Sequence, residues 1–231
     1  MGLKADLDTE VGAIFRSSWS ERDGRVVPDD SSIQLGNDGV NLEATVLYAD
    51  MADSTVLVDN YSAKFAAEVY KAFLRVAAKI ISSENGTITA YDGDRVMAVY
   101  MGDYTNTRAV RTGLKINWAC KNIIQPALNR IYTNTQFTVK HVVGVDTSKL
   151  FVARAGIRGA NDLVWIGRAA NYAAKLSAMD DMYPTWITDT VYDAMIGDMK
   201  IHNGQNRWEA RSWTPMAGKT IYRSAWSWVV P

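Results

Sequence analysis

The sequence predicts an α+β fold in which helices and largely antiparallel strands share one core. Segments with strand-like and helix-like periodicity alternate in the order strand, helix, hairpin, helix, hairpin, helix and further strands. The chain has 231 residues, of which 48% are hydrophobic and 22% charged, so it can bury a substantial core. When each hairpin is counted as two strands, the first six elements predict a ferredoxin-like βαββαβ kernel, with extra strands and a helix at the C-terminal end.

Residues 1–40 are predicted to form an N-terminal helix and a linker. Val11, Ile14, Phe15 and Trp19 recur at helical spacing. The stretch 20–39 is rich in Asp, Asn, Ser and Gly, which is typical of turns. We therefore expect the main domain to span residues 41–231.

The first half of the kernel begins with a β-rich apolar run at 44–49, which predicts a buried strand that ends at Asp50. Apolar residues at every third or fourth position then predict one long amphipathic helix from 54 to 81. The runs 88–91 and 95–100 flank Asp92-Gly93-Asp94, which indicates a hairpin.

The second half begins with a predicted helix at 107–130 that is interrupted near Pro126, because proline lacks the backbone N–H a helix needs. A strand follows at 136–145, and residues 150–155 are expected to pair with it as a second strand. Residues 161–166 are predicted to be extended and 169–178 helical.

Composition excludes several classes of function. Lys plus Arg number 25, as do Asp plus Glu, so no basic excess favours a nucleic-acid or membrane-surface partner. One cysteine and two histidines exclude an intrachain disulfide framework and a Cys/His zinc cluster. Cys120, His141 and His202 are expected to be structural. No export signal or membrane span is recognisable, so a cytoplasmic location is expected.

Two carboxylates carry the strongest chemical signal. Asp50 closes the first strand and Asp94 lies in the hairpin turn, and these two segments are neighbours in a ferredoxin-like sheet. Carboxylate oxygens are ligands for hard divalent cations. Two such cations can activate a hydroxyl group and neutralise a triphosphate, which is the chemistry of nucleotidyl transfer and cyclisation. Asp92 alone is explained as an ordinary turn residue.

The turn after Asp50 is a candidate phosphate-binding segment, because it leads into a helix whose first N–H groups are unpaired. Taken alone it is equally well an ordinary helix start, with Asp53 or Ser54 as the N-cap. The candidate substrate-binding residues of this turn are Met51, Ala52, Asp53, Ser54 and Thr55.

Three sequence blocks resemble the signature blocks of class III nucleotidyl cyclases, in that family's order and at about its spacing. They are LYADMADST at 47–55, GTITAYDGDRVMAVY at 86–100 and DLVWIGRAANYAAKL at 162–176. The similarity extends from about residue 45 to residue 222. The resemblance implies the catalytic domain of such a cyclase, in which the ribose 3′-hydroxyl attacks the α-phosphate and pyrophosphate leaves.

The resemblance also implies roles for single residues. The family's two metal ligands correspond to Asp50 and Asp94, with the backbone carbonyl of Met51 as a further ligand to two divalent cations, Mn²⁺ or Mg²⁺. Its transition-state asparagine corresponds to Asn171. Its transition-state arginine corresponds to Lys175, a departure that keeps the charge and loses the bidentate fork. Arg168 is a candidate to compensate.

The base-recognising positions of the family correspond to Ala90 and Val164, which match neither the adenine nor the guanine pattern. Purine discrimination needs placed polar partners, and these side chains offer none. Tyr91 and Trp165 lie beside them and are candidates to narrow the pocket, although core packing explains such residues equally well. Lys219 lies near the C-terminal lysine that the family directs at the triphosphate; an edge-strand role is an equal alternative.

In this combination the chain is most similar to the pyrimidine cyclases of bacterial Pycsar anti-phage systems, whose cyclic UMP or cyclic CMP acts on a separately encoded effector. General similarity favours UTP over CTP. The resemblance also implies a homodimer, with two sites that each combine Asp50 and Asp94 of one copy with Asn171 and Lys175 of the other. The alternatives are an adenylate or guanylate cyclase, or a degenerate cyclase domain that binds nucleotide as a regulator.

Overall fold

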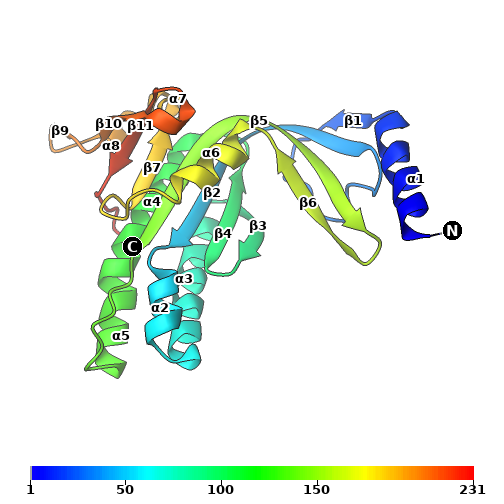
Figure 1. Cartoon of the computed structure of the whole chain (residues 1–231). Coiled ribbons are helices and arrows are strands. Elements are labelled where there is room, and N and C mark those ends of the chain that lie inside the picture. The colour runs from blue at the N-terminus through cyan, green and yellow to red at the C-terminus, as the bar shows by residue number, and fades with distance from the viewer. Residues whose placement is uncertain (1) are drawn as a thin grey trace.

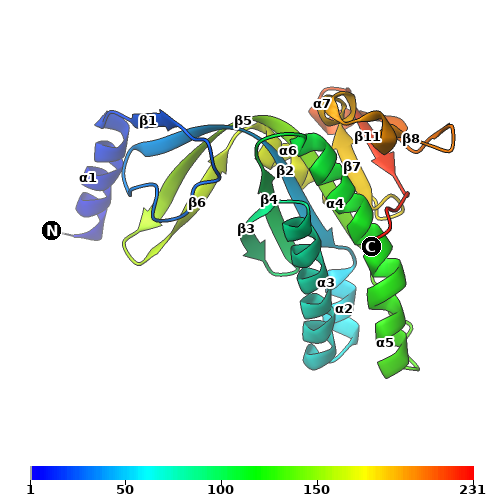
Figure 2. The same ribbon diagram turned by 180° about the vertical axis from the view of Figure 1, so that it is seen from behind.

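Nine strands form one mixed sheet with helices on both of its faces, in a computed structural model that describes residues 2–231 (Figures 1 and 2). Along the main path the strand order is β10-β11-β7-β5-β2-β4-β3, while β1 pairs with β2 and β6 pairs with β5. The strands of this sheet are β1 (Ser20–Asp23), β2 (Asp38–Met51), β3 (Thr87–Asp92), β4 (Arg95–Tyr100), β5 (His141–Ile157), β6 (Ala160–Ile166), β7 (Thr185–Thr188), β10 (Glu209–Trp213) and β11 (Lys219–Ser224).

The helices follow the strands in the alternation that the sequence predicts. A π-helical turn (Cys120–Ile124), a short 3₁₀ turn (Thr214–Met216) and a separate two-stranded ribbon of β8 (Ile201–His202) and β9 (Gln205–Asn206) complete the described chain. The helices are α1 (Leu3–Arg16), α2 (Ser54–Asn60), α3 (Ala63–Ser83), α4 (Thr105–Ala119), α5 (Gln125–Ile131), α6 (Arg168–Leu176), α7 (Asp189–Ala194) and α8 (Gly197–Lys200).

The predicted ferredoxin-like kernel is confirmed. It consists of β2, α3, β3, β4, α4 and β5, in that chain order, and its strands lie side by side as β5-β2-β4-β3 with every neighbouring pair antiparallel. β2 is the central strand, paired along its C-terminal half with both β4 and β5.

Side chains alternate across β2 and so build two cores. Leu47 and Ala49 belong to the larger core, which contains the buried faces of α3 and α4. Ala44 and Val46 point to the opposite face, where they pack with the buried alanines of α6. Asp50 is in register with this second series, so its side chain faces the same side of the sheet as α6.

The single helix predicted for 54–81 is wrong, because two helices occupy this segment. α2 ends at Asn60, and α3 begins after Ser62, whose hydroxyl accepts a hydrogen bond from the Phe65 amide at 3.3 Å. Serine is a favoured N-cap because its side chain satisfies an otherwise unpaired N–H. The apolar periodicity continues across the break and conceals it.

Of two later predictions about element boundaries, one is confirmed and one is wrong. The interruption near Pro126 is confirmed, and it takes the form of the π-helical turn Cys120–Ile124 directly before α5. The predicted pairing of 150–155 with 136–145 is wrong, since β5 runs without a turn from His141 to Ile157. Its partner is β6, in an antiparallel register from Phe151↔Ile166 to Ile157↔Ala160.

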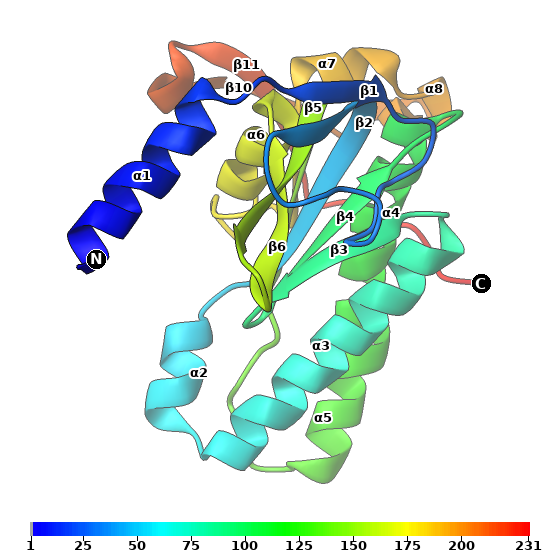
Figure 3. The same cartoon turned by 90° about the vertical axis from the view of Figure 1, so that its right-hand side faces the viewer.

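The ends of β5 and β2 leave the body of the molecule and form an arm with β6 and β1, and α1 lies at the end of this arm (Figures 1 and 3). Residues 20–23 pair in parallel with 38–41 of β2. α1 has no buried residue, and Leu7, Val11 and Ile14 are about half exposed on it. Within residues 2–231, none of the helices combines the length and hydropathy that a membrane crossing requires.

Candidate active site

Asp50 and Asp94 lie at the same end of neighbouring strands. Asp50 is the penultimate residue of β2, and the pairing of β2 with β4 places it opposite Arg95. Asp94 directly precedes Arg95 in the β3–β4 turn. The predicted proximity of the two carboxylates therefore follows from strand register.

The turn that carries Asp94 has a defined geometry. Asp92 and Arg95 form the last strand pair, which leaves Gly93 and Asp94 as a two-residue loop. Gly93 has φ of +61°, a conformation that glycine adopts without the steric cost that a side chain incurs. The Arg95 guanidinium donates to Asp92 at 2.8 Å, so Asp92 is engaged in an exposed ion pair, in keeping with its prediction as a turn residue.

The electrostatics of Asp50 are those of a carboxyl group held beside a second one. Burial, reinforced by the negative charge of Asp94, raises the pKa of Asp50 to about 6, against a smaller opposing effect of Arg95. Oδ2 of Asp94 is buried and has no hydrogen-bond partner among the described residues. A buried acceptor without a partner is costly, and a bound cation would satisfy it.

These two carboxylates fit a divalent metal. Within residues 2–231 there is no cluster of three or more His, Cys, Asp or Glu side chains that could hold a metal ion. A Mg²⁺-type site commonly takes only one or two carboxylates and completes its shell with water and substrate phosphates. The donor set of Asp50, Asp94 and the Met51 carbonyl matches that pattern, in which the nucleotide itself supplies ligands.

The turn at 51–55 follows directly and is fixed by contacts at its base. Asp53 adopts the left-handed conformation (φ 60°) immediately before α2. Lys140, which precedes β5, binds Asp53 and Asp181 at 3.1 Å each, and its carbonyl accepts a hydrogen bond from the Ala52 amide at 3.0 Å. The turn is therefore ordered, although the helix it opens into has only seven residues.

Tyr70 is a neighbour of this site that the sequence did not point to. It extends from α3, where burial and the charge of Asp94 raise its pKa and a hydrogen bond with Ser54 lowers it. Tyr48 is another, since the Arg95 guanidinium lies 5.4 Å from the centre of its ring. Strand alternation is the signal for Tyr48, because it lies two residues before Asp50 and so shares its face.

Asn171 and Lys175 form a second group on α6. Both are exposed and lie one helical turn apart, so they share a face of the helix. Among residues 2–231, no hydrogen bond or ion pair links either of them to Asp50 or Asp94. One chain thus presents two separate groups of predicted catalytic residues.

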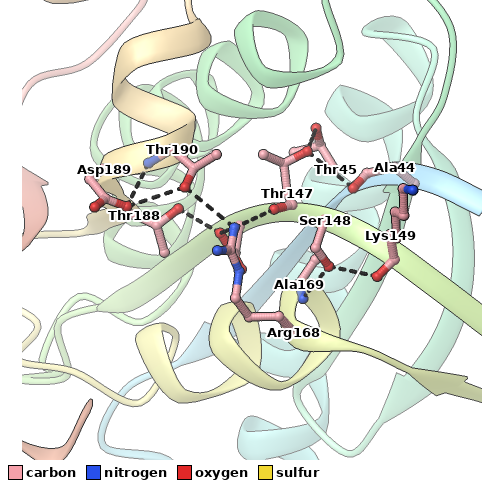
Figure 4. Close-up of polar contacts among 11 residues, drawn as sticks. Ala44, Thr45, Thr147, Ser148, Lys149, Arg168, Ala169, Thr188, Asp189 and Thr190 are labelled. Carbon is pink, nitrogen blue, oxygen red and sulfur yellow. Dashed lines mark hydrogen bonds and ion pairs between the residues drawn. The ribbon is translucent and has the colours of Figure 1, made fainter. Parts of the chain in front are cut away.

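Arg168, at the start of α6, forms an ion pair with Asp146 of β5, with Nε 3.0 Å from Oδ2 (Figure 4). The expectation that Arg168 compensates for Lys175 is therefore not favoured, since its guanidinium is already engaged. Lys219, at the start of β11, lies with its ammonium 5.4 Å from the centre of the Tyr172 ring. The predicted triphosphate lysine is thus adjacent to α6.

The predicted base-recognising residues occupy two distant strands. Ala90 and Tyr91 lie on β3 at one edge of the sheet, whereas Val164 and Trp165 lie on β6 in the arm. Ala90 and Trp165 both pack on the core beside α6, while Tyr91 and Val164 are exposed. Among the histidines and the cysteine, burial lowers the pKa of His141 to about 3 and raises that of Cys120 to about 12, which suits structural roles.

Comparisons with known proteins find relatives that align over nearly the whole chain. No family model matches the chain. A uridylate cyclase from Xanthomonas perforans is 49% identical over 229 residues, 99% of each chain. One from Burkholderia cepacia is 48% identical over 232 residues, the full length of both, and one from Rhodovulum sp. (strain MB263) is 37% identical over 98% of this chain and 97% of its own.

Solved structures show the same fold at low sequence identity. The guanylyl cyclase Cya2 superposes with a TM-score of 0.68 at 18% identity, over 82% of this chain and 95% of its own. The adenylyl cyclase CyaB from P. aeruginosa gives a TM-score of 0.66 at 20% identity, over 80% of this chain and 95% of its own. The class III cyclase fold expected from the three sequence blocks is confirmed, and the chain belongs to the uridylate cyclase family.

Proposed function

We propose that this protein converts UTP to 3′,5′-cyclic UMP and pyrophosphate. The observation that carries the proposal is the half-buried pair Asp50 and Asp94, in which Oδ2 of Asp94 has no partner among the described residues. Asp50 directly precedes the turn at 51–55, whose base is fixed by Lys140. Relatives named uridylate cyclase that align over nearly the whole chain support UTP as the substrate, in preference to CTP.

Each predicted residue has a definite task in this reaction. Asp50, Asp94 and the Met51 carbonyl hold two divalent cations, Mn²⁺ or Mg²⁺, which when bound activate the 3′-hydroxyl and neutralise phosphate charge. Backbone N–H groups of the turn bind the β- and γ-phosphates. Asn171 orients the ribose, and Lys175 and Lys219 stabilise the charge that develops on the phosphates.

The complete site requires two copies of the chain. Asn171 and Lys175 are exposed on α6 and unconnected to Asp50 and Asp94 of the same chain, so a symmetric dimer provides each site with both groups. Such a dimer has two equivalent sites. Its pocket combines Ala90 and Tyr91 of one copy with Val164 and Trp165 of the other, without a polar side chain at the two base-recognising positions.

The cellular role follows from the product. Cyclic UMP made in this way would serve as a second messenger in bacterial anti-phage defence, acting on a separately encoded effector. We place the catalytic domain at residues 41–231 and treat 1–40 as an N-terminal extension that contributes β1 to the arm.

A nucleotide panel tests the proposal. Purified protein is incubated separately with UTP, CTP, ATP and GTP and Mn²⁺, and cyclic mononucleotide and pyrophosphate are quantified. Cyclic UMP as the main product supports the proposal. Cyclic AMP or cyclic GMP as the main product contradicts the pocket argument, and nucleotide binding without any product favours the regulatory alternative.

A further inference from the structure

Asp146 is completely buried, yet it has no part in the reaction proposed above. It lies on β5, where burial raises its pKa while Thr188 and Arg168 lower it. A buried carboxylate is expensive unless it is paired and hydrogen-bonded. The hydrogen-bond partners of Asp146 therefore indicate which elements this carboxylate fixes to β5.

The carboxylate of Asp146 on β5 is contacted from α6 and from β7. Figure 4 shows the two contacting residues, Arg168 and Thr188. From α6, Arg168 donates Nε to Oδ2 at 3.0 Å and Nη2 to Oδ1 at 3.3 Å. From β7, the Thr188 hydroxyl donates to Oδ1 at 2.6 Å. Nη2 of Arg168 also donates to the Thr147 carbonyl at 2.6 Å and to the Thr190 hydroxyl at 3.3 Å.

Further contacts fix the first turn of α6 to β5. The hydroxyl of Ser148 accepts from the Ala169 amide at 2.9 Å and so satisfies an N–H at the start of the helix. The Cα of Gly167 approaches β5 so closely that a Cβ there would lie 2.7 Å from the Lys149 carbonyl oxygen. These contacts immobilise α6 at the end nearest Asn171.

We propose that Asp146, Arg168 and Thr188 form a clamp that positions Asn171 for the partner's site. Asn171 is three residues after Arg168, so it projects from the same part of the helix one turn away. Its own side chain is exposed, and the described contacts that orient it are those of the helix. The inference rests on the proposed function. Asp146, Arg168 and Thr188 are in this view positioning residues, which act through Asn171 and do not touch the substrate.

The clamp also links α6 to β7, which is the neighbour in the sheet of the strand β11 that carries Lys219. Thr188 pairs with Ile221 of β11, and β11 begins at Lys219. Tyr172 lies between the two cations, 5.7 Å from the guanidinium of Arg168 and 5.4 Å from the ammonium of Lys219. The first turns of α6 and the start of β11 are therefore linked through Tyr172.

A double-mutant cycle tests the clamp. Thr188→Val removes the hydroxyl group and keeps the side-chain volume nearly constant. Arg168→Lys keeps the positive charge and loses the bidentate contact with Asp146. Each is expected to lower kcat for UTP about tenfold with KM within about twofold, since small misplacements of a positioning group are costly to turnover. In an Asn171→Ala background, each loss is expected to fall below about threefold, because the side chain that the clamp positions is then absent.

Thr185→Val is the matched control, because Thr185 is a buried threonine on the same strand whose hydroxyl has no partner among the described residues. It is expected to leave kcat unchanged in both backgrounds. A loss for Thr188→Val or Arg168→Lys of the same size with and without Asn171, or no loss at all, overturns the clamp. Thr185→Val acting like Thr188→Val also overturns it.

Amide hydrogen exchange separates failure of the clamp from failure of the proposed function. Thr188→Val is expected to speed exchange of α6 amides about tenfold while exchange in α3 and α4 stays at the parental rate. If the parent makes no cyclic nucleotide but α6 loosens in this way, the proposed function is wrong, whereas the attachment of α6 by these three residues is upheld. If α6 exchange does not change, the clamp is wrong whatever the activity.

Discussion

Asp50 has to be deprotonated to bind a cation, yet the fold gives it the surroundings of a group that holds its proton. Burial and Asp94 raise its pKa to about 6. In the absence of metal the two carboxylates therefore oppose each other, and a bound cation relieves that repulsion. Binding of the proposed cation would therefore be coupled to deprotonation of this one residue.

Asp50→Asn is expected to lower kcat for cyclic UMP by at least about 1,000-fold, because a metal-ligand contact supplies several kcal/mol and each 1.4 kcal/mol is a factor of ten. The measurement is the initial rate of cyclic UMP formation with saturating Mn²⁺. Asp92→Asn is the matched control, since Asp92 is exposed and paired with Arg95. An Asp50→Asn enzyme within tenfold of the parent would contradict the metal assignment.

The raised pKa of Asp50 predicts a stability change with pH in the metal-free protein. The unfolded chain releases this proton near pH 4 and the folded chain near pH 6, so the stabilising contribution present below pH 4 is lost as pH rises through about 6. In EDTA, urea unfolding should find Asp50→Asn more stable than the parent at pH 7.5 and equal to it at pH 4. A parent that gains stability over the variant between pH 4.5 and 7 would refute the burial argument.

Lys175 is expected to act as a charge that arginine can replace. Lys175→Arg should keep kcat within about threefold, whereas Lys175→Ala should lose about 100-fold, the usual effect of removing one transition-state donor. Steady-state kinetics with UTP distinguish the two. Equal activity of Lys175→Ala and the parent would remove Lys175 from the catalytic group.

At the scale of elements, α6 depends on how closely it lies against β5. A Cβ at Gly144 would lie 2.1 Å from the Ala173 carbonyl oxygen and 2.5 Å from the Ser177 nitrogen, so strand and helix backbones meet at this glycine. The substitution Gly144→Ala forces them apart. The helix that carries Asn171 then moves from its place.

Gly144→Ala is accordingly expected to reduce the free energy of unfolding by about 1–3 kcal/mol, the usual cost of overpacking, and to lower kcat more than 10-fold. Gly197→Ala is the control, because a Cβ there has no atom within 4 Å. Urea unfolding and cyclic UMP assays give both quantities. Unchanged activity for Gly144→Ala would show that the position of α6 does not matter.

Local patterns in the sequence predicted the elements more reliably than their ends. Alternation and helical periodicity identified β2, the β3–β4 hairpin and α6 because each follows from neighbouring residues. The break between α2 and α3 was missed because the apolar periodicity continues across it, so nothing in that pattern marks Ser62 as the N-cap of a second helix. The length of β5 was missed since its pairing with β2 over 13 positions depends on distant residues.

The residues of the candidate site also separate into those that local sequence motifs predicted and those that only the structure reveals. Motif positions led to Asp50, Asp94 and Asn171, whereas the Asp146–Arg168–Thr188 clamp joins residues up to 42 positions apart and has no local signature. Tyr70 likewise reaches the site only because α3 folds back over the sheet. Contacts of this kind depend on tertiary packing and are not encoded in any short segment.

At the scale of the whole molecule, the arm and the exposed residues Asn171 and Lys175 of α6 suit a two-chain assembly. The arm extends from the body (Figure 1). The helix α1 at its end has no buried residue. The two groups of proposed catalytic residues lie on one chain, and among residues 2–231 no hydrogen bond or ion pair joins them. This arrangement supports our proposal that one molecule is half of a symmetric catalyst.

Subunit mixing tests this central claim most directly. Asp50→Asn and Asn171→Ala variants are each expected to be nearly inactive with UTP, because every site in either homodimer lacks one group. Mixed in equal amounts and allowed to exchange, half of the dimers become mixed, and each has one intact site of two. Cyclic UMP formation should then recover to about one quarter of the parental rate. A mixture no more active than the sum of its components, while the parent is active and exchange of subunits is verified, would contradict a site shared between two chains.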